Sequence, residues 1–360
     1  MKIGLITMHN VCNYGAVLQT YALMCKIKEI TNDCSIINYI PPIRKGLRVF
    51  FPKEKSPFFR TLMSWIKWFP IRLSWQKTFK GFINSYYDSL TIPVYRKTIR
   101  RLSDSFDAII TGSDQVWNSD STRGVDPCYF LEFAGKNTRK IAYAASISSI
   151  DYQKKEDLAI ASYLSGFESI SIREKKMIDE MSKLTESRIV QTVDPTILVE
   201  KAFWLKFADE CKETINEKYC LMYILGESKN SLEYANAQRA NKNVKTVKIS
   251  FTRKKEADIV LKNPSPTRFV KLFLNSSSVI TNSLHGCLFS LISNVNFAIP
   301  VDVLSSTRFV DFINTYGLKK YSRRDDEAGM IIINPNYEEI NKLMAEKRCS
   351  SLSFLEGALK

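Results

Sequence analysis

The chain has 360 residues, 45% of them apolar and 25% charged, which is enough for two globular domains and excludes a largely disordered chain. Lysine and arginine outnumber aspartate and glutamate by 52 to 37, and the formal charge of +15 favours anionic partners. No apolar run approaches the roughly 20 residues of a spanning helix, and the short apolar start is no signal-peptide core, so we predict a cytoplasmic protein.

The chain begins with a pattern typical of a strand, a polar loop and a helix. Residues 2–8 form a short apolar run suited to a buried strand, and residues 16–30 carry apolar side chains at helical spacing. Asn13 is placed to cap this helix. A second strand is predicted over 34–40. Asn13 and Tyr14 are candidate ligand contacts, although the loop lacks the full G-x-G-x-x-G fingerprint of dinucleotide sites.

Residues 43–100 interrupt this rhythm with a basic and aromatic segment in which we expect helices and loops. One interpretation is an insertion that packs on the domain. The other is a surface that touches membrane lipid or a lipid-linked substrate, which would place the protein at the inner face of the membrane. The sequence leaves both open.

Strands and helices alternate through the rest of the chain. The further predicted strands cover 107–112, 139–146, 169–172, 189–193, 219–225, 244–249, 278–282 and 297–301. The further predicted helices cover 153–166, 174–183, 201–213, 229–240, 266–275, 284–293 and 306–316. This alternation predicts an α/β protein with parallel, doubly wound sheets. We expect Rossmann-like domains over 1–195 and 196–335, a hinge near 194–200, a final helix over 336–360, and a substrate cleft between the domains.

The segment 278–290 is the most informative, because its pattern predicts a strand, a tight turn and a helix. Asn282 or Ser283 can cap this helix, whose first N–H groups can hold an anion. His285 falls in the first turn and is a candidate acid or base, while Gly286 allows close approach to the backbone. The alternative is a histidine that only hydrogen-bonds its own turn.

A polar cluster follows the strand predicted at 107–112. Ser113, Asp114, Gln115 and Asn118 offer hydrogen-bonding groups that suit a polyhydroxylated ligand, and Trp117 could stack on a sugar ring. The alternative is a helix cap beside a core tryptophan.

Two arginines are candidate anion ligands. Arg173 ends a short apolar strand, and its guanidinium can grip a carboxylate or phosphate with two parallel bonds. Arg308 lies beyond the strand that follows His285 and could reach the same anion. The alternative for Arg173 is a structural ion pair.

These segments, taken in order from residue 10 to about 320, resemble the polysaccharide pyruvyl transferase family. The resemblance rests on Asn13-Tyr14-Gly15-Ala16, Gly112-Ser113-Asp114-Gln115-Val116-Trp117-Asn118, Ser171-Ile172-Arg173-Glu174, Val193-Asp194-Pro195-Thr196 and Thr281-Asn282-Ser283-Leu284-His285-Gly286. It implies two Rossmann-like domains arranged like a GT-B glycosyltransferase. It also implies transfer of a pyruvyl group from phosphoenolpyruvate to a hexose of a cell-surface glycan, such as an exopolysaccharide or capsule, or its lipid-linked precursor.

The resemblance also distributes roles over the candidate residues. In the family the histidine of the last motif is essential, and an arginine matching Arg173 contacts the donor. Some members carry arginine where this chain has Ser283, so Arg308 is a candidate replacement. The predicted catalytic residues are His285 and Asp114. The predicted donor contacts are Arg173, Asn282, Ser283, Gly286 and Arg308. The predicted acceptor contacts are Asn13, Tyr14, Ser113, Gln115, Trp117 and Asn118.

The reaction needs a proton at the methylene carbon of the donor and cations around its carboxylate and phosphate. We assign the proton to His285, which we expect to be a competent acid mainly when the donor anion is bound. Arg173 would hold that anion, and Asp114 could take the proton of the sugar hydroxyl. The hypothesis requires His285 and Arg173 to converge on the donor across the predicted cleft.

No cofactor is expected beyond phosphoenolpyruvate as co-substrate. The chain has two histidines and eight scattered cysteines without a C-x-x-C pair, so no metal site is predicted. One alternative is a GT-B nucleotide-sugar glycosyltransferase of the same shape. Another is a non-catalytic, membrane-associated protein. Nucleic acid is not an expected partner, because no binding motif occurs and the charge is spread along the chain.

Overall fold

The protein is described by a computed structural model that covers residues 1–42, 73–147, 159–226, 228–242, 244–250 and 256–360. It consists of two compact units, which are described separately below. Unit 1 comprises Met1–Leu198 together with Ser350–Lys360, and unit 2 comprises Val199–Cys349. The change from one unit to the other at residue 198 lies close to the predicted boundary at residue 195.

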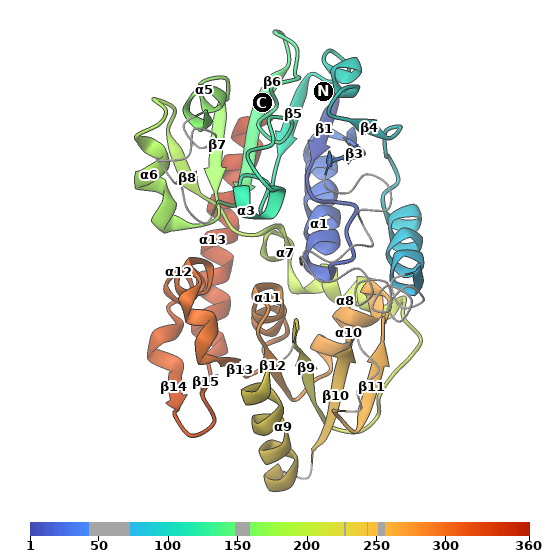
Figure 1. The fold of residues 1–360 in the computed structure, drawn as a ribbon, viewed down its shortest axis with the longest axis vertical. Coiled ribbons are helices and arrows are strands. Elements are labelled where there is room, and N and C mark those ends of the chain that lie inside the picture. The colour runs from blue at the N-terminus through green and yellow to red at the C-terminus, as the bar shows by residue number, and fades with distance from the viewer. Residues whose placement is uncertain (43–72, 148–158, 227, 243, 251–255) are drawn as a thin grey trace, which may run out of the picture. The chain divides into compact units, whose positions relative to one another are not determined.

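Unit 1 is built on a six-stranded parallel sheet in the order β2-β1-β5-β6-β7-β8 (Figure 1). The strands are β1 (Ile3–Ile6), β2 (Cys34–Ile36), β5 (Ala108–Thr111), β6 (Arg139–Ala145), β7 (Ser169–Ile172) and β8 (Ile189–Gln191). β1 and β5 are buried along their whole length, as expected for strands covered on both faces. The chain runs from β1 to β2 and then continues with β5 on the other side of β1. The carboxyl ends of β1 and β5 therefore form the switch point of this sheet, where such folds usually bind ligands.

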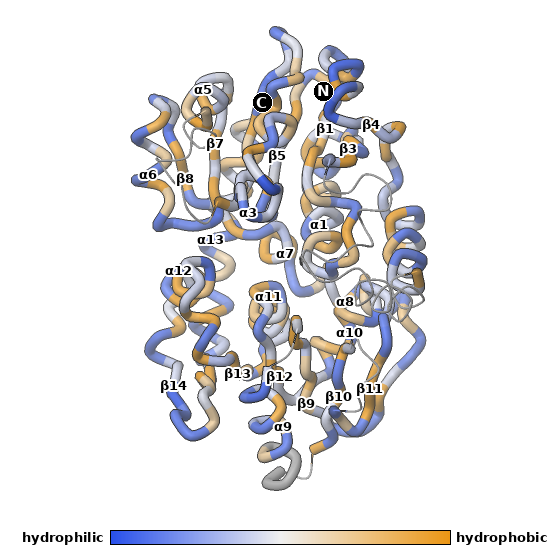
Figure 2. The backbone as a smooth tube through the Cα atoms, viewed as in Figure 1, coloured by the Kyte–Doolittle hydropathy of each residue, from blue (hydrophilic) through white to orange (hydrophobic). Residues whose placement is uncertain are grey.

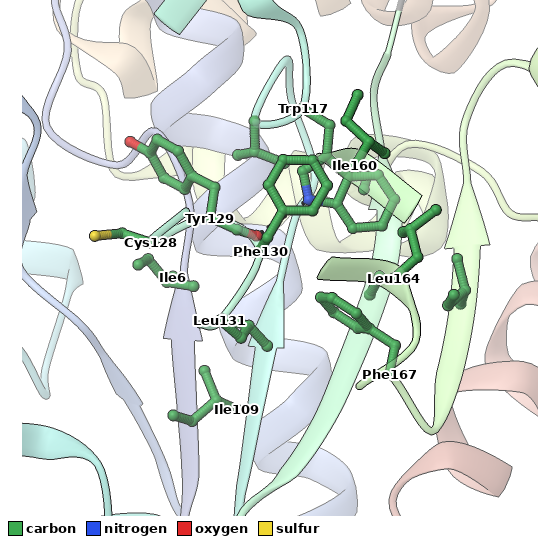
Figure 3. Packing of buried hydrophobic residues seen from close by; sticks show 14 of the residues in the cluster. Ile6, Ile109, Trp117, Cys128, Tyr129, Phe130, Leu131, Ile160, Leu164 and Phe167 are labelled. Atoms are coloured by element: carbon green, nitrogen blue, oxygen red, sulfur yellow. Dashed lines mark hydrogen bonds between the residues drawn. The ribbon is translucent and has the colours of Figure 1, made fainter. Parts of the chain in front are cut away.

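The helices and short strands of unit 1 surround this sheet. They are α1 (Tyr14–Thr31), β3 (Tyr39–Ile40), β4 (Val94–Tyr95), η3 (Ile99–Leu102), α3 (Ser119–Thr122), α5 (Ile160–Leu164), η4 (Lys175–Met177), α6 (Ile178–Ser182) and α7 (Pro195–Leu198). The cap predicted at Asn13 is confirmed, because its side chain accepts a hydrogen bond from the Ala16 N–H at 3.2 Å. A buried cluster fills the space beside β5, β6 and β7 and includes Trp117, Phe130 and Phe167 (Figure 3).

Part of the basic and aromatic segment is described, namely residues 73–100; residues 43–72 lie outside the described part of the chain. Residues 73–86 are helical and pack on α1. The Phe79 ring lies 4.9 Å from that of Tyr14, and the Tyr87 hydroxyl donates to the Val17 carbonyl at 3.0 Å. For this described portion the structure agrees with an insertion packed on the domain.

Unit 2 carries a seven-stranded sheet in the order β11-β10-β9-β12-β13-β15-β14. Its strands are β9 (Tyr219–Tyr223), β10 (Lys245–Ser250), β11 (Ile259–Lys262), β12 (Ser278–Thr281), β13 (Phe297–Pro300), β14 (Ser322–Asp325) and β15 (Met330–Ile333). The first five positions in this order are parallel, whereas β15 pairs antiparallel with both β13 and β14. The predicted parallel strands are confirmed, and the unpredicted β15 and hydrophilic β14 (Figure 2) add an antiparallel edge to the sheet. The switch point of unit 2 lies between β9 and β12.

The helices of unit 2 follow the predicted pattern closely. They are α8 (Lys201–Asp209), α9 (Lys229–Lys242), α10 (Pro266–Leu274), α11 (Leu284–Ser293), η5 (Val301–Ser305), α12 (Thr307–Thr315), η6 (Leu318–Tyr321) and α13 (Tyr337–Ala358). α13 begins in unit 2, but its final turns belong to unit 1. There the Ser351 hydroxyl accepts the Val193 N–H at 3.0 Å, and the Ala358 carbonyl accepts from Arg139 at 3.1 Å.

The cysteines and the helix lengths can also be compared with the sequence analysis. All eight cysteines are free thiols, and five of them are buried, as expected for small apolar residues. Among the described residues, none of the helices has the length and apolar character needed to cross a bilayer.

Candidate active site

The turn between β12 and α11 lies at the switch point of unit 2 and is held rigidly. The Thr281 hydroxyl donates to the Tyr223 carbonyl at 2.7 Å and accepts the Ser283 N–H at 3.1 Å. The Asn282 side chain binds both backbone groups of Leu225: Oδ1 accepts its N–H at 2.7 Å and Nδ2 donates to its carbonyl at 2.9 Å. The loops that follow β9 and β12 are thereby fixed to each other by their own side chains.

His285 is the one residue of α11 that is partly exposed, although its ring Nε2 atom is buried. The other nine, from Leu284 to Ser293, all lie in the interior, so α11 is a central helix with no solvent-facing stripe. The imidazole stands in the first turn, where helix N–H groups have no acceptor within the helix. Ser283 occupies the N-cap position with extended backbone, but its side chain makes no capping hydrogen bond. The helix dipole and these N–H groups favour an anion beside His285.

Ser283 itself points into unit 2. Its side chain is 6% exposed and is hydrogen-bonded to the phenol of Tyr223. Burial raises the pKa of Tyr223, and the hydrogen bond from Ser283 partly opposes that rise. The Ser283 hydroxyl is thus used inside the domain, and its contact with the donor stays a prediction. Arg308 lies in the first turn of α12, and its side chain is partly exposed.

The loops at the switch point of unit 1 are also joined by side chains. The Thr7 hydroxyl, just after β1, donates to the Ser113 carbonyl, just after β5, at 3.0 Å. Gln19 of α1 reaches back and donates to the Thr7 hydroxyl at 3.1 Å. Ser113 is fully buried, so its side chain cannot touch an acceptor in this conformation.

Three more predicted acceptor contacts are buried and serve the structure of unit 1. Tyr14 is 0% exposed and packs on the ring of Phe79. Trp117 stacks on Phe130 with centroids 5.0 Å apart, inside the hydrophobic cluster, so it offers no free face to a sugar ring (Figure 3). Asn118 caps α3 by accepting the Asp120 N–H at 3.0 Å. Each of these side chains is used by the fold, and acceptor contact by any of the three stays a prediction.

Asp114 and Gln115 remain partly exposed at the same switch point, and Asn13, which caps α1, is exposed. Asp114 has a backbone φ of 75°, and its carboxylate accepts the Gln115 N–H at 2.9 Å. The Gln115 side chain accepts a hydrogen bond from Ser121 at 2.7 Å. The predicted catalytic residue Asp114 and the predicted acceptor contacts Gln115 and Asn13 thus combine a polar group with access to solvent.

Arg173 lies in a buried ionic network at the carboxyl end of β7. Each of its three guanidinium nitrogens donates to a partner in unit 1: to Asp194 at 2.8 Å, to Ser146 at 2.9 Å and to Glu174 at 3.4 Å. Arginine and both carboxylates are at most 9% exposed. Burial lowers the pKa of Arg173, but Glu174, Asp194 and Asp114 outweigh burial and raise that pKa above its ordinary value. The structure thus bears out the ion-pair alternative, and donor contact by Arg173 remains a prediction.

A model of the polysaccharide pyruvyl transferase family matches residues 13–302, a range that contains all five of the sequence segments discussed above. The chain belongs to the polysaccharide pyruvyl transferase family. No curated protein is similar enough to count as a match.

Three solved structures illustrate what this pyruvyl transferase family member is similar to. A Listeria monocytogenes protein assigned as a UDP-N-acetylglucosamine 2-epimerase has a TM-score of 0.50 at 9% identity, over 99% of this chain and 91% of its own. The UDP-GlcNAc 2-epimerase of Methanocaldococcus jannaschii, solved with UDP-GlcNAc and UDP, has a TM-score of 0.47 at 11% identity, over 96% and 99%. The E. coli heptosyltransferase WaaC with ADP has a TM-score of 0.39 at 12% identity, over 82% and 86%. At such low identities the comparison shows the fold alone, an α/β chain with Rossmann-like units.

Sequence reasoning missed the residues that hold the family motifs in place. Thr281, Tyr223 and the Leu225 backbone support the histidine turn, while Asp194 and Glu174 neutralise Arg173. The carboxylates could have been noticed, since Glu174 adjoins the arginine. Within the described residues, no group of three or more His, Cys, Asp or Glu side chains is placed to hold a metal ion.

Gly286 is required by its contact with Thr281. A Cβ built at Gly286 would lie 2.2 Å from the Thr281 hydroxyl oxygen and 2.9 Å from its Cβ. The close approach expected at this glycine is therefore confirmed, and the group that approaches is the neighbouring side chain in the same domain. Direct contact of Gly286 with the donor stays a prediction.

We expect Gly286→Ala to lower the free energy of unfolding by about 1–3 kcal/mol, because overpacking must shift the start of α11. Activity should fall further than stability, since His285 moves with that turn. Thermal unfolding and turnover should be measured together with Thr281→Ala, which removes the clashing oxygen, and the double variant should lose less than the sum. Gly357→Ala is a matched control, because no atom lies within 4 Å of its added Cβ. Additive losses would contradict the contact.

Proposed function

We propose that the chain transfers a pyruvyl group from phosphoenolpyruvate to two hydroxyls of a hexose, in a cell-surface glycan or its lipid-linked precursor. Family membership supports the class of reaction. The observation that carries the proposal is His285, the one residue of the buried helix α11 that is partly exposed, at the switch point of unit 2. We place this reaction in the cytoplasm, because phosphoenolpyruvate is a cytoplasmic metabolite.

The chemistry divides into two additions at the same carbon. A proton adds to the methylene carbon of the enol phosphate, and C2 becomes an oxocarbenium-like centre. The first sugar hydroxyl attacks C2 and loses its proton. The second hydroxyl then attacks C2, the bond from C2 to the phosphate oxygen breaks, and the second proton is released. One donor and one diol give one cyclic ketal and one phosphate, so no oxidant or reductant is needed.

The described residues supply distinct parts of this sequence. His285 acts as the acid toward the methylene carbon, or orients the departing phosphate, and the N–H groups of the first turn of α11 stabilise the anion. Asn282 is a positioning residue that fixes the turn through Leu225. Asp114, partly exposed in unit 1, is the proposed base for the sugar hydroxyl.

The test uses the full chain with phosphoenolpyruvate and a panel of hexose glycans in D₂O. We expect phosphate release that depends on acceptor, and a product methyl group that carries one deuterium, because the added proton comes from solvent. Proton NMR of the ketal methyl and a phosphate assay report both. A parallel set of assays replaces phosphoenolpyruvate with nucleotide-sugar donors. Release of nucleoside diphosphate in those assays, with no phosphate from phosphoenolpyruvate, would establish the glycosyltransferase alternative instead.

A further inference from the structure

A rigid, basic and partly apolar stretch of unit 1 lies outside the candidate site. It contains Ile92, Tyr95, Arg96, Lys97 and Arg101, and we call it the β4 surface (β4 is labelled in Figure 1). All five side chains are exposed. None of them takes part in the reaction proposed above.

The β4 surface is held by residues that point inward. Val94 and Ile99 lie among the exposed residues in the sequence and are 2% and 1% exposed, as members of the hydrophobic cluster of unit 1. β4 pairs with β3, and the turn after it is closed by the Thr98 N–H, which donates to the Tyr95 carbonyl at 2.8 Å. The backbone that carries the exposed side chains is therefore held by strand pairing, a turn hydrogen bond and buried apolar residues.

The charge of this stretch has one sign. Residues 89–103 contain four arginine and lysine residues and no acidic residue. Arg100 pairs with Glu132 at 2.8 Å. In the described part of the chain, no carboxylate lies within ion-pair distance of Arg96, Lys97 or Arg101. These three cations can therefore bind an external anion.

Apolar side chains accompany these cations. Ile92 is 71% exposed and Tyr95 is 38% exposed. A single exposed isoleucine is ordinary on a protein surface. Its place in the same short stretch as three cations matters, because a bilayer surface offers phosphates and hydrocarbon together. Nucleic acid would satisfy the cations but would offer no hydrocarbon to Ile92.

We propose that the β4 surface docks the protein on an anionic lipid bilayer, with Arg96, Lys97 and Arg101 at the headgroup phosphates and Ile92 among the upper acyl groups. This places the protein where a lipid-linked glycan is presented, although it does not depend on pyruvyl transfer. Each cation near an anionic surface strengthens binding about fivefold, so removing three should weaken it by on the order of 100-fold.

The experiment is sedimentation of the full chain with phosphatidylcholine vesicles, with and without phosphatidylglycerol. We expect binding only with phosphatidylglycerol. The triple variant Arg96→Ser, Lys97→Ser, Arg101→Ser should bind on the order of 100-fold more weakly. The matched control Lys136→Ser, Lys175→Ser, Lys212→Ser removes equal charge from exposed positions elsewhere, and should lose far less. Arg96→Lys with Arg101→Lys should retain binding.

Ile92→Ser separates lipid from other anions. It should weaken vesicle binding, most clearly at high salt where the cations are screened, and leave retention on a duplex DNA column unchanged. Equal losses in both triple variants, no effect of Ile92→Ser, or absence of vesicle binding would overturn the proposal. Activity on a soluble acceptor should be the same in all of these variants, so failure here is distinct from failure of the proposed reaction.

Discussion

Replacing His285 with alanine should lower the turnover number by about 100-fold or more, the usual contribution of a positioned acid or base. The fold should survive, because His285 is only partly buried, unlike the other nine residues of α11. Phosphate release under saturating phosphoenolpyruvate gives the turnover number, and thermal unfolding of the same samples shows whether the protein is intact. An acid acting on the bound donor predicts that the turnover number falls more than the donor affinity.

Two further variants sharpen this test. Added imidazole should restore part of the activity of His285→Ala, whereas a purely structural role would leave it unrestored. His285→Gln preserves hydrogen bonding without acid–base chemistry and should remain slow. Full turnover in His285→Ala would remove this residue from the mechanism.

Replacing Arg173 with alanine should lower the free energy of unfolding by about 3–5 kcal/mol, because Glu174 and Asp194 would be left buried without their cation. Chemical denaturation measures this change. Arg100→Ala is the matched control, since its ion pair with Glu132 is exposed and should contribute no more than about 1 kcal/mol. The combination of Arg173→Met with Glu174→Gln and Asp194→Asn should recover much of the loss, because no buried charge remains.

This result bears directly on the family-based role of Arg173 as a donor ligand. A simple loss of activity in Arg173→Ala would not distinguish a missing ligand from an unfolded domain. Binding of phosphoenolpyruvate to the folded, charge-compensated variant does distinguish them. Normal stability in Arg173→Ala, together with a large loss of donor affinity, would contradict the structural assignment and restore the donor contact.

Much of the fold could be predicted because its parallel strands are short apolar runs that end in polar turns. The strands β1, β5, β7, β9 and β12 all lie within the predicted ranges. β14 could not be predicted in this way, since its sequence Ser-Arg-Arg-Asp shows no apolar pattern and its place depends on pairing with β15. β11 was missed as well; it is an edge strand that is only partly buried, so it lacks the buried character of the equally short strands β1 and β5.

The candidate site was predicted less well than the strands that carry it. Sequence order placed the polar segments at the carboxyl ends of the strands, but it could not say which way each side chain points. Tyr14 turns toward Phe79, and Trp117 toward Phe130, because those partners come from elements distant in the sequence. His285 differs because every residue around it in α11 is apolar or small, which leaves one polar group in the first turn.

The path of α13 has a consequence for the order of folding during synthesis. Residues 350–360 complete unit 1, where they bond to Val193 and Arg139, yet they are translated after the whole of unit 2. The usual sequence, in which an N-terminal domain finishes folding before the next emerges from the ribosome, cannot be followed to its end here. Until those residues arrive, the nascent first domain lacks the partners that Ser351 and Ala358 give to Val193 and Arg139.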